Sequence, residues 1–231
     1  MRPAPFALAV VLVAGATVAA ATATTATLRD LPTRTSQIGS RAPNQVPAPR
    51  LKTGVTYRAS LFPLAVSVKT PNSTWSGAQG RTLTKGVSPT EQGPFGWVEL
   101  VQRLGAISII TAYGHTPSVA ATVTGLRTRG RGATYEPTSP VKLAGFSGST
   151  FDGQVVGATH YFIPFTPPSG AARFVPDSYE LGSGDVFRVI VLDVRGKTVV
   201  LFLDGNGSPA DQFPVFLTKA DQILGSLRFA A

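Results

Sequence analysis

Two neighbouring runs near the C-terminus constrain the fold of this chain more than any other feature. In residues 185–194 and 198–203, Val, Ile, Leu and Phe occupy both odd and even positions, and residues 195–197 separate the two runs. Successive side chains of a β-strand point to opposite faces of its sheet. The runs therefore predict a hairpin that is apolar on both faces, and such a hairpin belongs at the buried centre of a sheet.

The segment after this hairpin predicts a helix over about 212–224. Asp211 can cap it, Pro214 is tolerated within its first turn, and Gly225 is a suitable stop. Its apolar side chains form one stripe, typical of a helix that packs on a core. The stripe consists of Phe213, Phe216, Leu217, Ala220, Ile223 and Leu224.

A second helix is predicted over about 116–126. Thr116 can cap it and Pro117 suits its first position. Val119, Val123 and Leu126 share one face of this helix. Shorter runs rich in apolar and β-branched residues predict strands at 56–61, 64–69, 97–102, 106–111, 141–144, 150–156, 160–164 and 226–229. This order predicts an α+β fold, with an antiparallel β-sheet and two packed helices.

The C-terminal part of the chain resembles a known family of domains. A hairpin with Gly at its turn, a Phe-containing helix and the ending Ile223-Leu224-Gly225-Ser226-Leu227-Arg228-Phe229 are similar to the end of PsbP-like (Mog-type) α/β/α domains of exported actinobacterial proteins. The corner at residues 71–75 approximates a P-x-G-W pattern but lacks the Gly, and residues 143–148 resemble a strand entry in the middle of the domain. The similarity is strongest in 185–229. It implies a PsbP-like sandwich and a non-enzymatic role, and it supplies no catalytic residue.

The N-terminal residues predict export. Residues 1–23 have the pattern of a signal peptide, with Arg2, an apolar stretch over 6–18 and small-x-small sites at 19–23. The apolar stretch is shorter than the roughly 20 residues of a membrane helix, so we expect cleavage, with an uncleaved anchor as the alternative. The chain has no cysteine, which excludes a lipid-modified cysteine and disulfides. Residues 24–54 are expected to be a disordered basic linker, and 55–231 a single domain.

The excess of positive charge lies mainly in this leader and linker. Residues 1–58 carry seven Lys and Arg against Asp30, which accounts for +6 of the formal net charge of +9. Such a segment attracts polyanions. For an exported bacterial protein, an anionic wall polymer, a lipid headgroup or another protein are the expected partners, and nucleic acid is not expected.

No catalytic or metal-binding constellation is found in the sequence, and no cofactor is predicted. The segment at 145–149 lacks the final Gly of a nucleophile elbow. His115 and His160 do not have metal-ligand spacing. Asp204 begins a segment that resembles a calcium loop but lacks the required Gly and Glu.

Two groups of residues remain as binding candidates. Arg127, Arg129 and Arg131 alternate along the chain, and in an extended segment they would point to one side and bind anions. Phe162 and Phe165 could line an apolar mouth. We therefore expect a monomeric, non-catalytic envelope binding or scaffold module. The alternatives are a carrier of a small apolar ligand and a secreted hydrolase without a recognisable motif.

Overall fold

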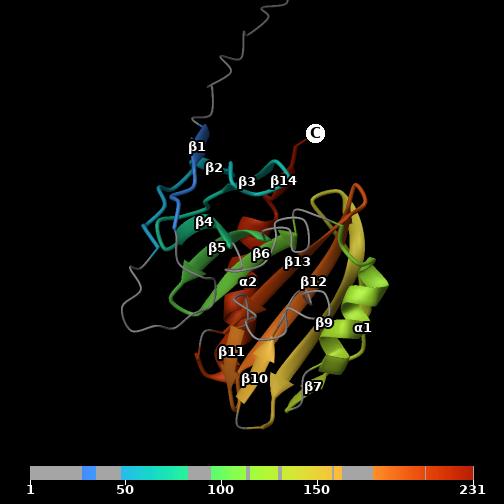
Figure 1. Ribbon diagram of the computed structural model, residues 1–231. Coiled ribbons are helices and arrows are strands. Elements are labelled where there is room, and N and C mark those ends of the chain that lie inside the picture. The colour runs from blue at the N-terminus through green and yellow to red at the C-terminus, as the bar shows by residue number, and fades with distance from the viewer. Residues whose placement is uncertain are drawn as a thin grey trace, which may run out of the picture.

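A computed structural model shows the fold of the chain. It describes residues 28–34, 48–82, 95–112, 115–129, 132–157, 159–162, 179–205 and 207–230. The expected signal peptide at 1–23 and part of the expected linker lie outside these residues. Figure 1 shows one large sheet that crosses the molecule, with a smaller sheet at one end.

The large sheet has the predicted hairpin at its centre. Its strands follow the order β4-β5-β6-β13-β12-β9-β7, and β8 pairs with β9. All of these pairings are antiparallel. The bounds are β4 Ser76–Thr82, β5 Phe95–Gln102, β6 Gly105–Ala112, β7 Ala133–Tyr135, β8 Ser139–Leu143, β9 Phe146–Val155, β12 Val186–Val194 and β13 Lys197–Asp204.

The turn of the central hairpin explains why Gly follows Arg195. Arg195 and Gly196 have φ values of 56° and 77°. Two successive residues with positive φ form the type I′ turn that matches the twist of a two-residue hairpin. The predicted hairpin and its position are confirmed.

Two smaller sheets complete the described strands. The first, called the small sheet from here on, has the order β1-β2-β3-β14. Its bounds are β1 Leu28–Asp30, β2 Thr56–Ala59, β3 Val66–Lys69 and β14 Arg228–Phe229. Only β1 pairs in parallel with its neighbour in this sheet. The second is the antiparallel pair β10 Thr159–Phe162 and β11 Tyr179–Gly182.

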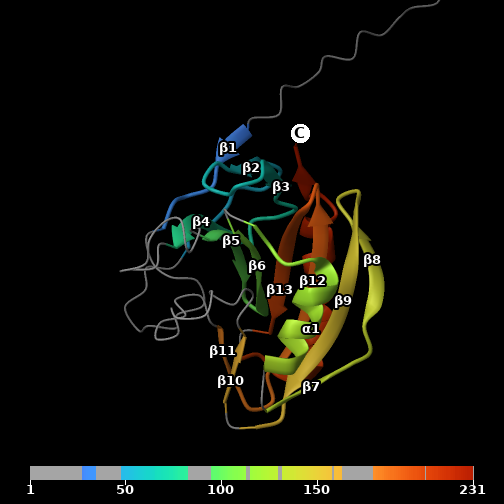
Figure 2. The same ribbon diagram turned by 45° about the vertical axis from the view of Figure 1, so that its right-hand side comes forward.

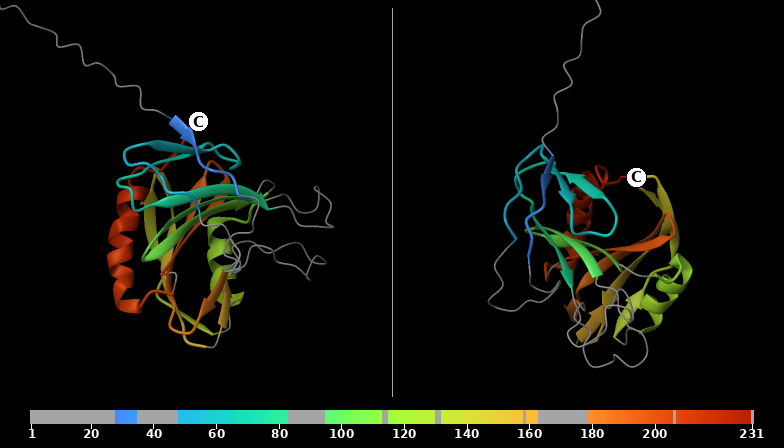
Figure 3. Two further views of the ribbon diagram at one scale, coloured as in Figure 1. Left: turned by 90° about the vertical axis from the view of Figure 1, so that its left-hand side faces the viewer. Right: turned by 45° about the horizontal axis from the view of Figure 1, so that its top comes forward.

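The two helices lie on opposite faces of the large sheet (Figure 3, left). Helix α2, Phe213–Leu224, agrees with the predicted stripe, because Phe213, Phe216 and Ile223 are among its buried residues. Asp211 does not cap it: this residue lies in a short 3₁₀ helix, Ala210–Gln212, that leads into α2. The C-terminal end at Gly225 is as predicted.

Helix α1 spans Val119–Arg129, three residues further along than the predicted 116–126. The reason is the cap. The Ser118 hydroxyl accepts a hydrogen bond from the Ala121 N–H at 3.2 Å, whereas the Thr116 hydroxyl accepts one from the Thr198 N–H at 2.8 Å. Thr116 therefore anchors the chain to strand β13, and the predicted cap is wrong. The predicted apolar face is confirmed, since Val123 and Leu126 are buried.

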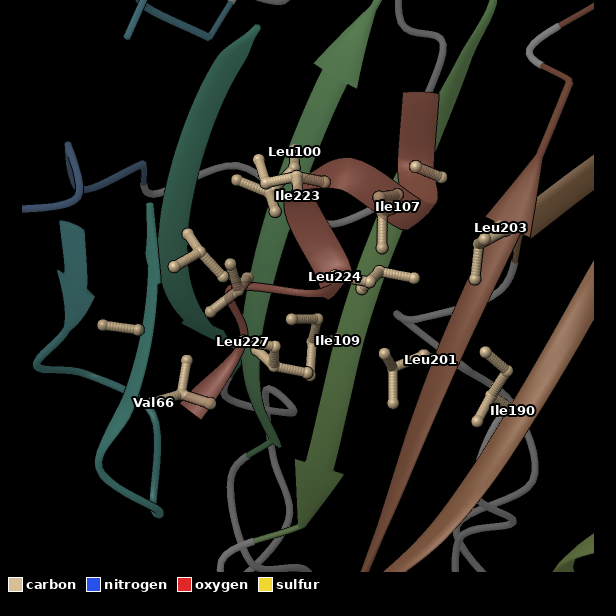
Figure 4. Packing of buried hydrophobic residues seen from close by; sticks show 14 of the residues in the cluster. Val66, Leu100, Ile107, Ile109, Ile190, Leu201, Leu203, Ile223, Leu224 and Leu227 are labelled. Carbon is tan, nitrogen blue, oxygen red and sulfur yellow. The ribbon is translucent and has the colours of Figure 1, made fainter. Parts of the chain in front are cut away.

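The large sheet separates two apolar layers. On one side, residues of α2, the small sheet and the large sheet form a cluster, of which Leu100, Ile109, Leu201, Ile223 and Val66 are seen in Figure 4. On the other side, residues of α1 pack against the other face of the same strands. The two tryptophans are divided between the layers, Trp75 in the α2 layer and Trp97 in the α1 layer.

Parts of the expected linker belong to the fold, so the predicted domain start at residue 55 is too late. Leu31 and Leu51 are each 2% exposed and join the α2 layer. The Gln79 side chain on β4 connects the Leu31 segment to the loop after β2: its amide N–H donates to the Leu31 carbonyl at 2.8 Å, and its oxygen accepts from the Leu61 N–H at 2.8 Å. The segment was predicted to be disordered because it contains few large apolar residues. Its isolated leucines are buried only by strands that are distant in the sequence.

The buried position of Leu31 can be tested by substitution. We expect Leu31→Ala to lower the free energy of unfolding by about 2–4 kcal/mol, because it removes a buried side chain and leaves a cavity. The matched control is Leu28→Ala in strand β1, three residues before Leu31, since Leu28 is 53% exposed. Urea unfolding followed by circular dichroism measures both. Equal, small effects of the two substitutions would mean that this segment is not part of the cooperative domain.

Candidate anion-binding pocket

Helix α1 and strand β7 border a shallow, open pocket around Arg127. Its volume is about 670 Å³. It contains one cation and several hydroxyl groups, and it lies at the end of α1 that is far from strand β1 (Figure 2). Its lining consists of Val123, Thr124, Arg127, Thr128, Ala133, Thr134, Tyr135 and Thr138.

The Arg127 side chain is half-buried and held on three sides. Its guanidinium carbon lies 5.9 Å from the centroid of the Tyr135 ring and 5.8 Å from that of Phe151. Its Nη1 donates a hydrogen bond to the Thr138 hydroxyl at 2.9 Å. Cation–π contacts of this kind restrict the guanidinium without consuming its N–H donors.

Arg127 has no carboxylate partner among the described residues, whose salt bridges join other pairs. An arginine has five N–H donors, and the bond to Thr138 uses one of them. The remaining donors form a fork that matches the oxygens of a phosphate or carboxylate. The pocket therefore offers an oriented positive charge to an anionic group.

The positive charge of Arg127 lies close enough to Tyr135, on the pocket wall, to affect the pKa of its phenol. Burial raises the pKa of the Tyr135 phenol, and the positive charge of Arg127 opposes this rise in pKa. The phenol O–H donates to the Leu126 carbonyl at 3.4 Å. Tyr135 thus stays protonated at neutral pH and joins the β7 wall to helix α1.

The predicted arginine triplet does not form as expected. Arg127 and Arg129 lie on helix α1 and not on an extended segment. Two residues along a helix are about 200° apart around its axis, so positions 127 and 129 do not lie on one face as they would along an extended segment. Arg131 lies outside the described residues, and so does the side chain of Arg129. The residues that instead accompany Arg127, above all Tyr135 and Thr138, were missed because only the fold of β7 brings them beside the helix.

The other candidates have separate positions. His115 is exposed before α1 and lines a second pocket of about 500 Å³ together with Asp193 and Thr198. His160 and Phe162 belong to β10, but their side chains lie outside the described part of the structure, as does Phe165. Within the described ranges, no group of three or more His, Asp or Glu side chains lies close enough together to hold a metal ion.

A second polar group went unnoticed in the sequence. Arg34 and Glu99 form an ion pair of 2.8 Å, with side chains 14% and 16% exposed. Strand pairing places Glu99 opposite Ala78 and Ser108, and Ala78 belongs to the α1 layer. Arg34 and Glu99 are far apart in the sequence, so no local pattern marks them.

Comparisons with known proteins concern the fold. No protein-family model matches the chain, and no curated protein matches its sequence. Among solved structures, it is similar to cyanobacterial PsbP (CyanoP) from Synechocystis sp. PCC 6803, with 15% identity, a TM-score of 0.40, and coverage of 81% of this chain and 99% of that chain. It is also similar to LpqN, involved in cell envelope biogenesis of Mycobacterium tuberculosis, with 16% identity, a TM-score of 0.31, and coverage of 81% and 83%. The predicted α+β class is confirmed by the antiparallel sheets and two helices of the structure itself.

The Arg34–Glu99 pair predicts a pH dependence of stability. Burial raises the pKa of the Glu99 carboxyl, and the charge of Arg34 opposes the rise only in part. The folded state therefore binds this proton more tightly than the unfolded chain, in which the pKa is about 4.3. Stability contributed by Glu99 should fall as the pH rises from this value through the folded pKa, and then level off.

Carbon-detected NMR titration of the Glu99 carboxyl measures its pKa directly, and urea unfolding at several pH values measures the stability. Glu99→Gln keeps an acceptor for Arg34 but does not titrate, so its stability curve should lack this component. A Glu99 pKa at or below the ordinary value would contradict the prediction.

Proposed function

We propose that this protein is a non-catalytic binding module of the bacterial cell envelope that holds an anionic group, a phosphate or a carboxylate, against Arg127. The observation that carries the proposal is the guanidinium itself. It is oriented by Tyr135 and Phe151, it donates to Thr138, and no carboxylate of the described residues neutralises it. A cation arranged in this way is prepared for a ligand.

The rest of the pocket favours a ligand that also accepts and donates weak hydrogen bonds. Threonines line it from both the helix and the β7 side. Some of their hydroxyl protons are already donated to the backbone, as when Thr128 donates to the Thr124 carbonyl at 2.8 Å. A hydroxyl that donates elsewhere can still accept. The surroundings of Arg127 therefore suit a substituted anion, such as a phosphate or uronate group of a wall polymer.

The proposal of a non-catalytic role has a chemical basis. Acid–base and nucleophilic catalysis need a base within hydrogen-bond reach of the reacting group. Around Arg127 the described pocket offers threonine hydroxyls and a tyrosine whose pKa is raised by burial. Neither residue type is a base at neutral pH, so binding without turnover fits this set best. No helix in the described ranges is long and apolar enough to cross a membrane.

Titration with inorganic phosphate and with acetate, followed by amide chemical shifts in NMR, tests the site. We expect saturable shifts around α1 and β7, and at least a tenfold loss of affinity in Arg127→Ala, because hydrogen bonds to charged groups contribute about 1.5–3 kcal/mol. Arg127→Lys should also weaken binding, since it keeps the charge but loses the planar fork. Raising the salt concentration should weaken it further.

The matched control is Arg103→Ala, which removes an exposed arginine from the turn between β5 and β6 and should leave the affinity unchanged. Thermal unfolding of each variant separates loss of the site from loss of the fold. Undiminished phosphate and acetate binding by folded Arg127→Ala would refute this function for the pocket.

A further inference from the structure

The small sheet has one buried face and one open face. In strands β2, β3 and β14 the residues alternate: Tyr57, Ala59, Val66, Val68 and Phe229 are buried, and the residues between them point outward. The residues of edge strand β1 are all exposed. The open face lies at the end of the molecule where β1 and β14 lie (Figures 1 and 3).

The open face is basic. Strand pairing places Arg58 and Arg228 in one row on either side of Ser67. Lys69 lies two residues along from Ser67 on the same face, and all three basic side chains belong to exposed residues. Arg58 pairs with Asp30 at 2.5 Å, and Asp30 is the acidic residue of the small sheet. The ammonium of Lys69 has no carboxylate partner in the described part of the chain.

An apolar pocket adjoins this basic face. It has a volume of about 520 Å³ and includes Leu28, Phe62, Ala65 and Val66 on its walls, with Arg58 and Ser67 toward the open face. Leu28 is 53% exposed, one of the large apolar residues that the described chain leaves open to solvent. An apolar recess bordered by cations is complementary to an anionic lipid, whose headgroup and acyl chain offer both surfaces.

The course of the chain favours the same partner. Leu28 begins the first described strand, and the apolar stretch 6–18 precedes it in the sequence. The residues between them, 19–27, span at most about 30 Å when fully extended. Until the expected cleavage of the leader, while that stretch lies in a bilayer, the end of the domain that carries β1 is held close to the membrane surface.

We infer that the open face of the small sheet is a membrane-docking surface for anionic phospholipid. Its basic side chains lie among the headgroups, and the pocket beside Leu28 receives the upper part of an acyl chain. This docking is independent of the ligand proposed for Arg127. The Arg127 pocket is lined by residues of α1 and of the β7–β8 segment, and none of its lining residues belongs to the small sheet.

The absence of cysteine makes the orientation measurable, because a single introduced cysteine can carry an environment-sensitive NBD label. We would label Ala65→Cys, exposed in the pocket wall, and Gln154→Cys, exposed on β9 beside β7. With the full chain and phosphatidylglycerol vesicles, we expect the emission of the label at position 65 to increase and shift to the blue. The emission of the label at position 154 should not change. Phosphatidylcholine vesicles should give little change.

Both labelled chains carry the same residues 1–27, so membrane insertion of the leader by itself cannot produce this contrast. A label at position 65 that stays in water while the protein sediments with the vesicles would overturn the inference. So would equal responses at both positions, or equal responses to the two lipids.

Charge reversal provides an independent measurement on the full chain. Lys69→Glu should weaken sedimentation with phosphatidylglycerol vesicles about 5- to 30-fold, from a contribution of about 1 kcal/mol for each basic residue at an anionic surface. The matched control is Arg103→Glu in the turn between β5 and β6, also exposed, which makes the same change of net charge outside the strands of the small sheet. Equal losses in the two variants would show that net charge alone drives binding and would overturn a defined docking face.

Discussion

The fold depends on a hairpin that has no polar face. Within β13, Leu201 and Leu203 belong to the α2 layer, whereas Val200 and Phe202 belong to the α1 layer. Each of these side chains is at most 1% exposed. A strand of this kind is stable only when both faces of its sheet are covered, so the rest of the chain has to supply two layers of different construction.

The apolar layer on the α2 side is assembled from segments both near to and far from the hairpin in the sequence. Helix α2 supplies an apolar stripe close to the hairpin in sequence, but it covers only part of its face. The remainder is completed by the small sheet, and by Leu31 and Leu51 from a segment that is otherwise polar. The Gln79 amide donates to the buried Leu31 carbonyl and accepts from the Leu61 N–H after β2. The first bond makes burial of the Leu31 segment possible, because a buried carbonyl without a partner would cost about 1–3 kcal/mol.

Elements with a strong local period could be predicted from the sequence. The central hairpin, helix α2 and the apolar face of α1 were, because the positions of Phe216 or Val123 within a repeat settle which side they bury. Strand β4 was not predicted, since its glycines give Ser76–Thr82 the composition of a loop. Gly80 is needed there because a Cβ atom would lie 2.3 Å from the Trp97 ring, a requirement that arises only after β4 and β5 pair.

The candidate site was predictable in its central residue but not in its form. Alternation of arginines drew attention to Arg127, yet the helix continues through it and removes the geometry that the alternation implied. Arg127 is oriented by Tyr135, Thr138 and Phe151. These residues come close to the helix only because β7 pairs with β9 at this edge of the sheet. Long-range pairs such as Arg34–Glu99 leave no local signal for the same reason.

The division of the two tryptophans between the layers gives the protein a built-in pair of optical reporters. Trp75 and Trp97 are each 1% exposed, but they lie on opposite sides of the large sheet. A chain that keeps only one of them emits from only one layer, and its fluorescence follows water entry into that layer alone. Loosening of the α1 side, where Arg127 lies, can thus be distinguished in time from loosening of the side that the small sheet covers.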